Sequence, residues 1–178
     1  MRGYFAIGIE GVSKAGNMGN LIRTAHGFGA AFVFTIAPKL KDKDAAELAI
    51  YLSDTSKTPD HVPFYEYQRL EDVTLPQGCQ LVGVEITDQA VDMPSFRHPL
   101  KAAYILGSEM FSVSKETLKK CDHVIKIPTK FSLNVATAGA IVMYDRLLCY
   151  GKFGERPVTP YGKAPARPVP VHGKPGKR

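Results

Sequence analysis

The sequence predicts an α/β fold in which a parallel sheet is flanked by helices. Short apolar runs of strand length alternate with helix-like segments over residues 4–150. Near the start of the chain two such runs are joined by a helix, and this unit requires parallel strands and a right-handed crossover. With 178 residues the chain suits one domain with a sizeable core.

The first strand is expected at residues 4–9, YFAIGI, and the second at residues 31–36, AFVFTI. The helix between them is indicated by apolar residues at helical spacing, namely Leu21, Ile22, Ala25 and Phe28. Glycine-rich turns mark its expected limits: Gly16, Asn17 and Gly19 at the start, Gly27 and Gly29 at the end.

Arg23 lies about two turns into this helix. Its guanidinium is always charged and matches a phosphate in a two-pronged fashion, so Arg23 is a candidate for gripping an RNA backbone. On this segment alone the commoner outcome, a surface arginine paired with a carboxylate, is favoured.

Residues 37–60 are less informative. A lysine-rich loop, a helix-like run at residues 45–52 and a polar turn follow one another there. Lys39, Lys41 and Lys43 are candidates for phosphate contacts, but acidic residues are interleaved with them, so a solvated loop is favoured.

The rest of the domain continues the alternation and completes a doubly wound pattern. We expect strands at residues 62–65, 80–86 and 102–107, and a helix-like segment at residues 67–73. A further strand, HVIKIP at residues 123–128, precedes an apolar helix at residues 139–150.

Two loops carry polar groups at the carboxyl ends of these strands, where open α/β sheets bind ligands. In the first, Gly107, Ser108 and Glu109 precede a helix capped by Ser114. For Glu109 alone, a functional role and a role as a capping or ion-pairing residue are equally favoured. We expect loops 107–113 and 128–134 to leave the sheet side by side.

The second loop contains Ser132 and Asn134, just before the apolar final helix. A hydroxyl, an amide and the free backbone N–H groups of a helix start make a site for a polar ligand. The simpler alternative is that Ser132 or Asn134 caps the helix.

The net charge of +6 lies entirely in the last 28 residues. Residues 1–150, the predicted domain, hold 16 basic and 16 acidic residues, whereas residues 151–178 hold seven basic residues and one acid. Six of the 13 prolines are in this segment, so we expect an extended, flexible tail. Such a tail gains affinity for nucleic acid through counterion release, although a solvated solubility tail remains the alternative.

Composition narrows the class of protein. The chain is 44% hydrophobic and 22% charged, as expected for an ordinary globular protein, and its first ten residues are too short an apolar run for a signal peptide or membrane span. We therefore expect a cytoplasmic protein without membrane contact. The three cysteines, Cys79, Cys121 and Cys149, are far apart and in no metal-like spacing, which predicts free thiols.

Three stretches, taken together, resemble the SPOUT superfamily of RNA methyltransferases, specifically its SpoU/TrmH branch. Residues 17–25, NMGNLIRTA, are similar to the first motif of that family. LGSEMFSVS at residues 106–114 is similar to the second motif, and IPTKFSLNVATAGAI at residues 127–141 to the third. Their order and separations also agree, so the resemblance covers about residues 4–150.

The resemblance implies a carboxyl-terminal trefoil knot whose loops bind S-adenosylmethionine, largely through backbone groups. Carried over by position, the cofactor-binding residues are Val84, Glu85, Leu106, Gly107, Ile127, Ser132 and Leu133. A homodimer with the final helix in its interface is also implied.

The chemistry that the resemblance implies is methylation of a ribose 2′-hydroxyl in transfer or ribosomal RNA. Such a reaction needs alignment of the hydroxyl with an activated methyl group and removal of one proton, so no metal is required. Arg23 would engage a substrate phosphate or the ribose hydroxyl, in one arrangement from the opposite subunit, and Asn17 would orient that site. The cofactor loop and the ribose would be arranged by Glu109, Ser132 and Asn134.

One position departs from the family pattern, since Ser112 stands where the second motif usually has a glycine. Two other classes of function remain open. The chain could be a non-catalytic RNA-binding or ribosome-assembly factor on the same fold. A nucleotide-binding oxidoreductase is disfavoured, because the first turn carries no G-x-G-x-x-G and the chain has no P-loop.

Overall fold

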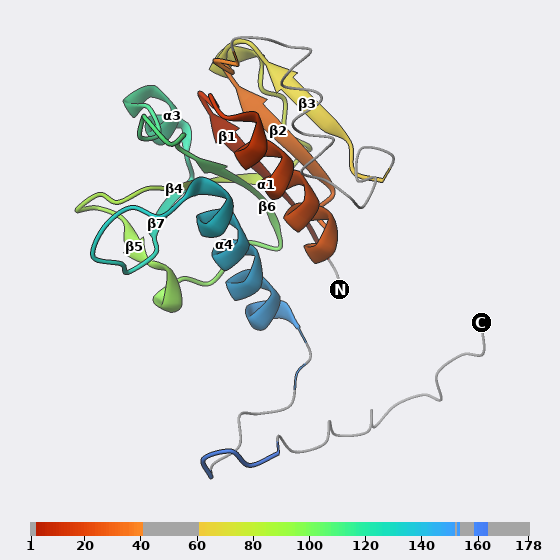
Figure 1. Ribbon diagram of the computed structural model, residues 1–178, viewed down its shortest axis with the longest axis vertical. Helices are drawn as coiled ribbons and strands as arrows, with labels where there is room; N and C mark the ends of the chain where they lie inside the picture. The colour runs from red at the N-terminus through yellow and green to blue at the C-terminus, as the bar shows by residue number, and fades with distance from the viewer. Residues whose placement is uncertain (1–2, 41–60, 152, 154–158, 164–178) are drawn as a thin grey trace.

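The computed structural model describes residues 3–40, 61–151, 153 and 159–163 (Figure 1). The helix-like run at residues 45–52, Lys41, Lys43 and most of the basic tail lie outside these residues. The described elements are β1 (Tyr4–Glu10), α1 (Ala15–Phe28), β2 (Phe32–Ile36), β3 (Phe64–Tyr67), the 3-10 turn η2 (Leu70–Asp72), β4 (Gln80–Val84), β5 (Val91–Asp92), the 3-10 turn η3 (Met93–Ser95), β6 (Lys101–Leu106), α3 (Lys115–Lys120), β7 (His123–Lys126) and α4 (Val135–Tyr150).

Seven strands form one sheet in the order β3-β2-β1-β6-β4-β7-β5, and every described pairing is parallel. The predicted parallel α/β fold is therefore confirmed. Because the strands share one direction, their carboxyl ends meet along one side of the sheet, here called the carboxyl edge, and their amino ends along the opposite amino edge. The central strands β1 and β6 are buried almost throughout, which explains why they read as unbroken apolar runs.

Helices α1 and α4 pack side by side against one face of the sheet (Figure 1). Gly139 lets them approach closely, because a Cβ atom at this position of α4 would lie 2.4 Å from Cδ1 of Leu21 on α1. On the opposite face, Ala6, Phe34 and Ile105 are buried beneath apolar side chains from the segment after β3 and from the end of α3. Among the described residues no helix is long and apolar enough to cross a bilayer.

Several element boundaries differ from those predicted. Helix α1 already begins at Ala15, so the expected starting turn at Gly16, Asn17 and Gly19 is part of the helix. Its predicted end is confirmed, because Gly29 adopts the left-handed conformation (φ 74°) and its N–H caps the last carbonyls. Helix α4 starts at Val135, four residues before the apolar run that indicated it.

The segment expected to be helix-like at residues 67–73 is a single turn, η2, while Tyr67 belongs to strand β3. The strand predicted at residues 62–65 is thus shifted by two positions. The two-residue strand β5 was not predicted, because two residues carry no periodic pattern.

The three cysteines are free, as predicted. Burial raises the pKa of the Cys121 thiol to about 12, so it remains protonated at neutral pH. It packs against Gly83 of β4, where an added Cβ would lie 3.1 Å from Cys121 Sγ. Cys121 therefore fills space between α3 and the sheet.

Candidate functional site

The carboxyl edge of the sheet holds a cavity of about 260 Å³ where β4, β6 and β7 end. All seven positions expected to meet a cofactor line it: Val84, Glu85, Leu106, Gly107, Ile127, Ser132 and Leu133. Loops 107–113 and 128–134 both contribute to its wall, as expected for neighbours at one edge. The cavity therefore gathers the segments that the second and third motifs indicated.

Two carboxylates hold the loop that follows β6 in place. Glu85 accepts hydrogen bonds from the backbone N–H of Val113 (2.8 Å) and of Ile86 (2.9 Å). Glu10, at the end of β1, accepts from the Ser114 N–H (2.9 Å) and the Thr117 hydroxyl (3.0 Å). Because hydrogen bonds to ionised acceptors are the stronger ones, the base of this loop is fixed.

Gly107 starts the loop at a point of close backbone approach. A Cβ atom there would lie 2.6 Å from the carbonyl oxygen of Phe111 and 2.8 Å from the backbone N of Val113. Both atoms belong to the backbone and cannot move aside cheaply. Only glycine fits this turn, which folds the loop back over the end of β6.

Glu109 connects the same loop to the first turn of α1. Its carboxylate accepts hydrogen bonds from the Ser13 hydroxyl (3.1 Å) and from Nδ2 of Asn17. Oδ1 of Asn17 in turn accepts from Nδ2 of Asn134 (3.0 Å). One hydrogen-bonded chain thus joins Glu109, Asn17 and Asn134, which come from the three motifs.

Asn134 also caps helix α4. Its Oδ1 accepts from the backbone N–H groups of Ala136 (3.0 Å) and Thr137 (3.3 Å). The simpler alternative for this residue is therefore correct, but the side chain does more than cap, because its Nδ2 reaches Asn17. Asn134 and Asn17 each retain one amide hydrogen that bonds to no described residue, and these hydrogens are available to a ligand.

Large apolar side chains stand exposed around the cavity. Met110 (70% exposed), Phe111 and Ile86 line it, and Phe131 (74% exposed) projects from the loop after β7. Exposed apolar groups beside a cavity are typical of a binding site whose ligand covers them.

The structure does not bring every predicted residue into this cluster. Ser132 is exposed and lines the cavity, but Arg23 is exposed on α1 and bonds to no other described residue. The arginine–carboxylate pair favoured on sequence grounds is thus not formed among the described residues.

Sequence reasoning missed Ser13 and Glu10. Ser13 lies four residues before the first motif. Glu10 ends a buried strand at the carboxyl edge, and this position was the signal available for it. The role of Glu85 in holding the loop was also missed, since its partner Val113 is 28 residues away.

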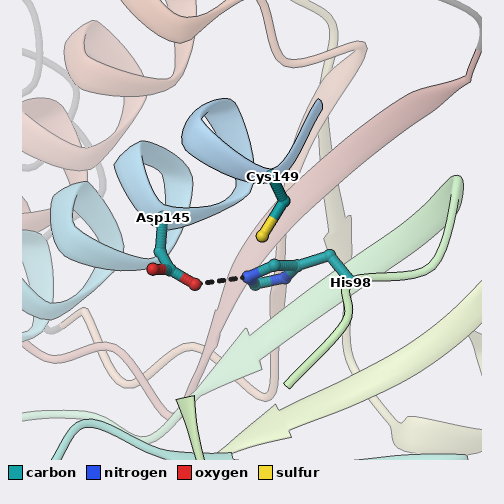
Figure 2. A group of neighbouring side chains, drawn as sticks. All are labelled: His98, Asp145 and Cys149. Atoms are coloured by element: carbon teal, nitrogen blue, oxygen red, sulfur yellow. Dashed lines mark hydrogen bonds and ion pairs between the residues drawn. The ribbon is translucent and has the colours of Figure 1, made fainter. Parts of the chain in front are cut away.

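A second polar cluster lies at the amino edge, where α4 crosses the start of β6. Figure 2 shows His98, Asp145 and Cys149, whose potential ligand atoms all lie within 4.8 Å of one another. His98 Nε2 is 2.9 Å from an Asp145 oxygen, and His98 Nδ1 is 2.6 Å from the Tyr104 hydroxyl.

The hydrogen bonds of this cluster determine where the His98 proton lies. Burial raises the pKa of the Tyr104 hydroxyl, which therefore stays protonated. The other neighbour of this hydroxyl, Arg146, is itself a donor, so Tyr104 donates its proton to Nδ1 of His98. His98 then carries its proton on Nε2 and donates to Asp145. Burial also lowers the pKa of His98, keeping the ring neutral. Both ring nitrogens are occupied, so the group is better suited to holding α4 than to binding a metal.

Comparison with known proteins agrees with the motifs. Residues 4–144 match the model of the SpoU rRNA Methylase family. The chain is 27% identical over 142 residues to the mouse (Mus musculus) tRNA (guanosine(18)-2′-O)-methyltransferase TARBP1, covering 75% of this chain and 9% of that protein. It is 28% identical over 143 residues to a Staphylococcus aureus protein named as a TrmH family tRNA/rRNA methyltransferase, covering 77% of this chain and 56% of the relative.

The fold is also similar to solved structures. The AdoMet-bound rRNA methyltransferase from Sinorhizobium meliloti superposes with a TM-score of 0.73 at 21% identity, over 84% of this chain and 58% of that one. The chain thus spans little more than half, or less, of each of these proteins. Since the family model matches most of its length, the chain belongs to the SpoU rRNA Methylase family.

Proposed function

We propose that this protein transfers a methyl group from S-adenosylmethionine to a ribose 2′-hydroxyl of transfer or ribosomal RNA. The observation that carries the proposal is the hydrogen-bonded chain of Glu109, Asn17 and Asn134 at the carboxyl edge, beside the cavity. The names of the relatives support the class of reaction and both classes of RNA.

The cavity suits S-adenosylmethionine in size and chemistry. It is bounded by the ends of three parallel strands, offers backbone groups beside Gly107, and has apolar side chains that would cover an adenine ring. Two carboxylates, Glu85 and Glu109, supply negative charge near a cationic ligand. When bound, the cofactor supplies an activated methyl group.

The residues of the chain would then position the acceptor. Glu109 fixes the Asn17 amide, Asn17 fixes Asn134, and the remaining amide hydrogens of both asparagines can hold ribose oxygens. The Ser132 hydroxyl lines the same wall and would orient the cofactor loop. Arg23 would contact a substrate phosphate or the reacting hydroxyl, at an active site shared with a second subunit.

The proposal includes a homodimer and a trefoil knot in the part of the chain that forms the cavity. Helix α4 exposes Tyr144 (54%) and Leu148, and Phe153 beyond it is exposed as well, so an apolar surface is available for a second copy. A partner bound at α4 could bring its own α1 and Arg23 toward the cavity. The measurement for the dimer is the solution mass by sedimentation, and a monomer at micromolar concentration would contradict it.

The basic tail, residues 151–178, is proposed to add affinity for RNA without reading sequence. Deletion of residues 157–178 should raise the KM for RNA and weaken its salt dependence. Equal RNA affinity of the full and shortened chains at two salt concentrations would exclude this role.

The test of the proposed function is methyl transfer from radiolabelled S-adenosylmethionine to bulk transfer RNA and, separately, to ribosomal RNA, both from cells that lack the protein. A 2′-O-methyl group blocks nuclease cleavage at its own position, so label in a nuclease-resistant dinucleotide is expected. Label in a base would contradict the ribose assignment. A chain that binds RNA but no cofactor would favour the non-catalytic alternative.

The role of Arg23 is tested separately. Arg23→Ala should keep S-adenosylmethionine binding but lower turnover about a hundredfold or more, because it acts on the acceptor side. Near-normal turnover would remove Arg23 from the mechanism.

A further inference from the structure

Lys39 is exposed, in agreement with the solvated loop favoured on sequence grounds, but its side chain has a defined neighbour beside the cavity. Its Nζ lies 4.0 Å from the centroid of the Phe111 ring, a cation–π contact with a residue that lines the cavity. The backbone N–H of Lys39 donates to the carbonyl of Val12 (2.8 Å), which ties this segment to the loop before α1. Both ends of the lysine are therefore held.

The surroundings of Lys39 bring three loops together. Gly11 has a positive φ of 68°, and a Cβ atom there would meet Ser108 Oγ at 3.9 Å and Lys39 Cε at 4.0 Å. Ser108 lines the cavity and accepts a hydrogen bond from the Phe111 N–H (3.2 Å). The loops after β1, β2 and β6 thus converge on one point of the rim.

The charge of Lys39 is not neutralised by any described residue. The carboxylates at this edge accept hydrogen bonds from other groups: Glu10 and Glu85 from the base of the loop after β6, and Glu109 from Ser13 and Asn17. Lys126, the lysine in the cavity wall, lies 3.9 Å from a carboxylate oxygen of Asp92. Lys39 is exposed and keeps its ammonium donors for an external anion.

The position of the ammonium identifies the side from which that anion comes. Phe111 is one of the residues that line the cavity and Lys39 is not, so the ammonium lies next to the rim and is no part of the cavity wall. An anion at Lys39 therefore belongs to the substrate that approaches from outside. A polynucleotide phosphate fits, because it must pass two carboxylates, Glu85 and Glu109, and a cation at the rim offsets their repulsion.

We propose that Lys39 is a substrate-positioning residue that binds a backbone phosphate of the RNA next to the methylated nucleotide, with Phe111 as its support. This inference rests on the proposed function for the identity of the substrate. It assigns Lys39 no part in cofactor binding or in the chemical step.

The experiment compares wild type with Lys39→Ala, Lys39→Arg and the control Lys101→Ala, which removes the same charge at the amino edge. KM for bulk transfer RNA, kcat at saturating RNA and the Kd of S-adenosylmethionine are measured for each. Lys39→Ala should raise the KM about 3- to 10-fold, with kcat and the cofactor Kd unchanged. Lys39→Arg should recover most of the loss, and Lys101→Ala should behave as wild type.

The dependence of RNA binding on salt adds a readout that a structural role would not change. Loss of one phosphate contact should reduce the slope of log K against log salt by about 0.7 to 0.9. A Lys39→Ala slope equal to that of Lys101→Ala would overturn the proposal, and so would a weakened cofactor Kd with unchanged RNA binding, which would assign Lys39 to the cofactor carboxylate.

Failure of the proposed methyl transfer can be distinguished from failure of the Lys39 proposal. If wild type transfers no methyl group, fluorescence anisotropy with labelled transfer RNA still gives the affinity and salt slope of each variant. A lower slope for Lys39→Ala in that assay supports the phosphate contact without turnover, and an unchanged slope contradicts it.

Discussion

The two edges of the sheet both carry polar clusters, but the clusters differ in how their hydrogen bonds are used. At the amino edge, Arg146 (2% exposed) and His98 (1% exposed) are buried among partners that consume nearly all of their donors and acceptors. At the carboxyl edge, Asn17 and Asn134 each keep an amide hydrogen that bonds to no described residue, beside the cavity. A closed network stabilises a fold, whereas an open one is prepared for a ligand.

The amino-edge cluster shows that titratable residues in proximity do not by themselves make a site. His98, Asp145 and Cys149 are close enough to hold a metal ion (Figure 2). Both His98 nitrogens, however, already have hydrogen-bond partners. Arg146 adds a buried positive charge that donates to the carbonyls of Pro99, Leu100 and Tyr4. Substitutions at the amino edge should therefore lower stability, whereas substitutions at the carboxyl edge should weaken ligand binding.

The largest expected effect is at Arg146. Arg146→Ala removes the hydrogen bonds that the guanidinium donates to the carbonyls of Pro99 and Tyr4 and to the buried Tyr104 hydroxyl, and should lower the free energy of unfolding by about 3 kcal/mol. Urea denaturation measures this, with Arg69→Ala as control, since Arg69 makes an exposed ion pair with Asp72. Equal midpoints for the two variants would contradict the structural role of the amino edge.

At the carboxyl edge, Gly107→Ala should weaken the binding of S-adenosylmethionine. The added Cβ would collide with backbone atoms of residues 111–113, so the loop must move and S-adenosylmethionine should bind about tenfold or more weakly. Gly27→Ala is the control: nothing lies within 4 Å of the added atom, and the exchange in the last turn of α1 should stabilise the helix by less than about 1 kcal/mol. An unchanged cofactor Kd for Gly107→Ala, by calorimetry, would argue against this loop as the cofactor wall.

Asn134 contributes both to stability, as the cap of α4, and to the hydrogen-bonded chain beside the cavity, so substitutions there can separate effects on stability from effects on binding. Asn134→Ala should cost about 1 kcal/mol of stability through loss of the α4 cap, and should also weaken cofactor binding. Asn134→Ser keeps a capping oxygen but cannot reach Asn17, so stability should recover while binding should not. Recovery of both by serine would reduce Asn134 to a helix cap.

The smallest expected effect concerns pH and His98. Because the folded pKa is lowered from 6.5, the unfolded chain binds a proton first as the pH falls through that value. The contribution of His98 to the free energy of unfolding should be fully present above pH 6.5 and should decline below it. The titratable and charged groups around the ring are Asp145, Arg146, Tyr104 and Cys149. His98→Gln should flatten the decline, and a decline equal to that of wild type would contradict the neutral His98.

Much of the fold could be predicted from local pattern. The buried strands are unbroken apolar runs, Gly29 and Ser114 mark helix ends by known capping chemistry, and the rule that ligands bind at the carboxyl edge located the cavity. The seven expected cofactor positions all line this cavity, although their role stays a prediction.

The features that the sequence did not predict depend on contacts between residues that are distant in the chain. Lys39 meets Phe111 across 72 positions, and Arg146 bonds to the carbonyl of Tyr4 across 142, so no local period indicates either pair. The start of α1 was misplaced because glycines that usually mark a turn lie inside the helix, where Gly19 is buried.

Hydrogen exchange followed by mass spectrometry, with and without S-adenosylmethionine, distinguishes a binding role from a structural role at each edge. The cofactor should slow exchange in the loops after β4, β6 and β7, and should leave residues 98–104 and the end of α4 unchanged. No change at the carboxyl edge in the presence of saturating cofactor, or protection centred on the amino edge, would contradict the assignment of the two clusters.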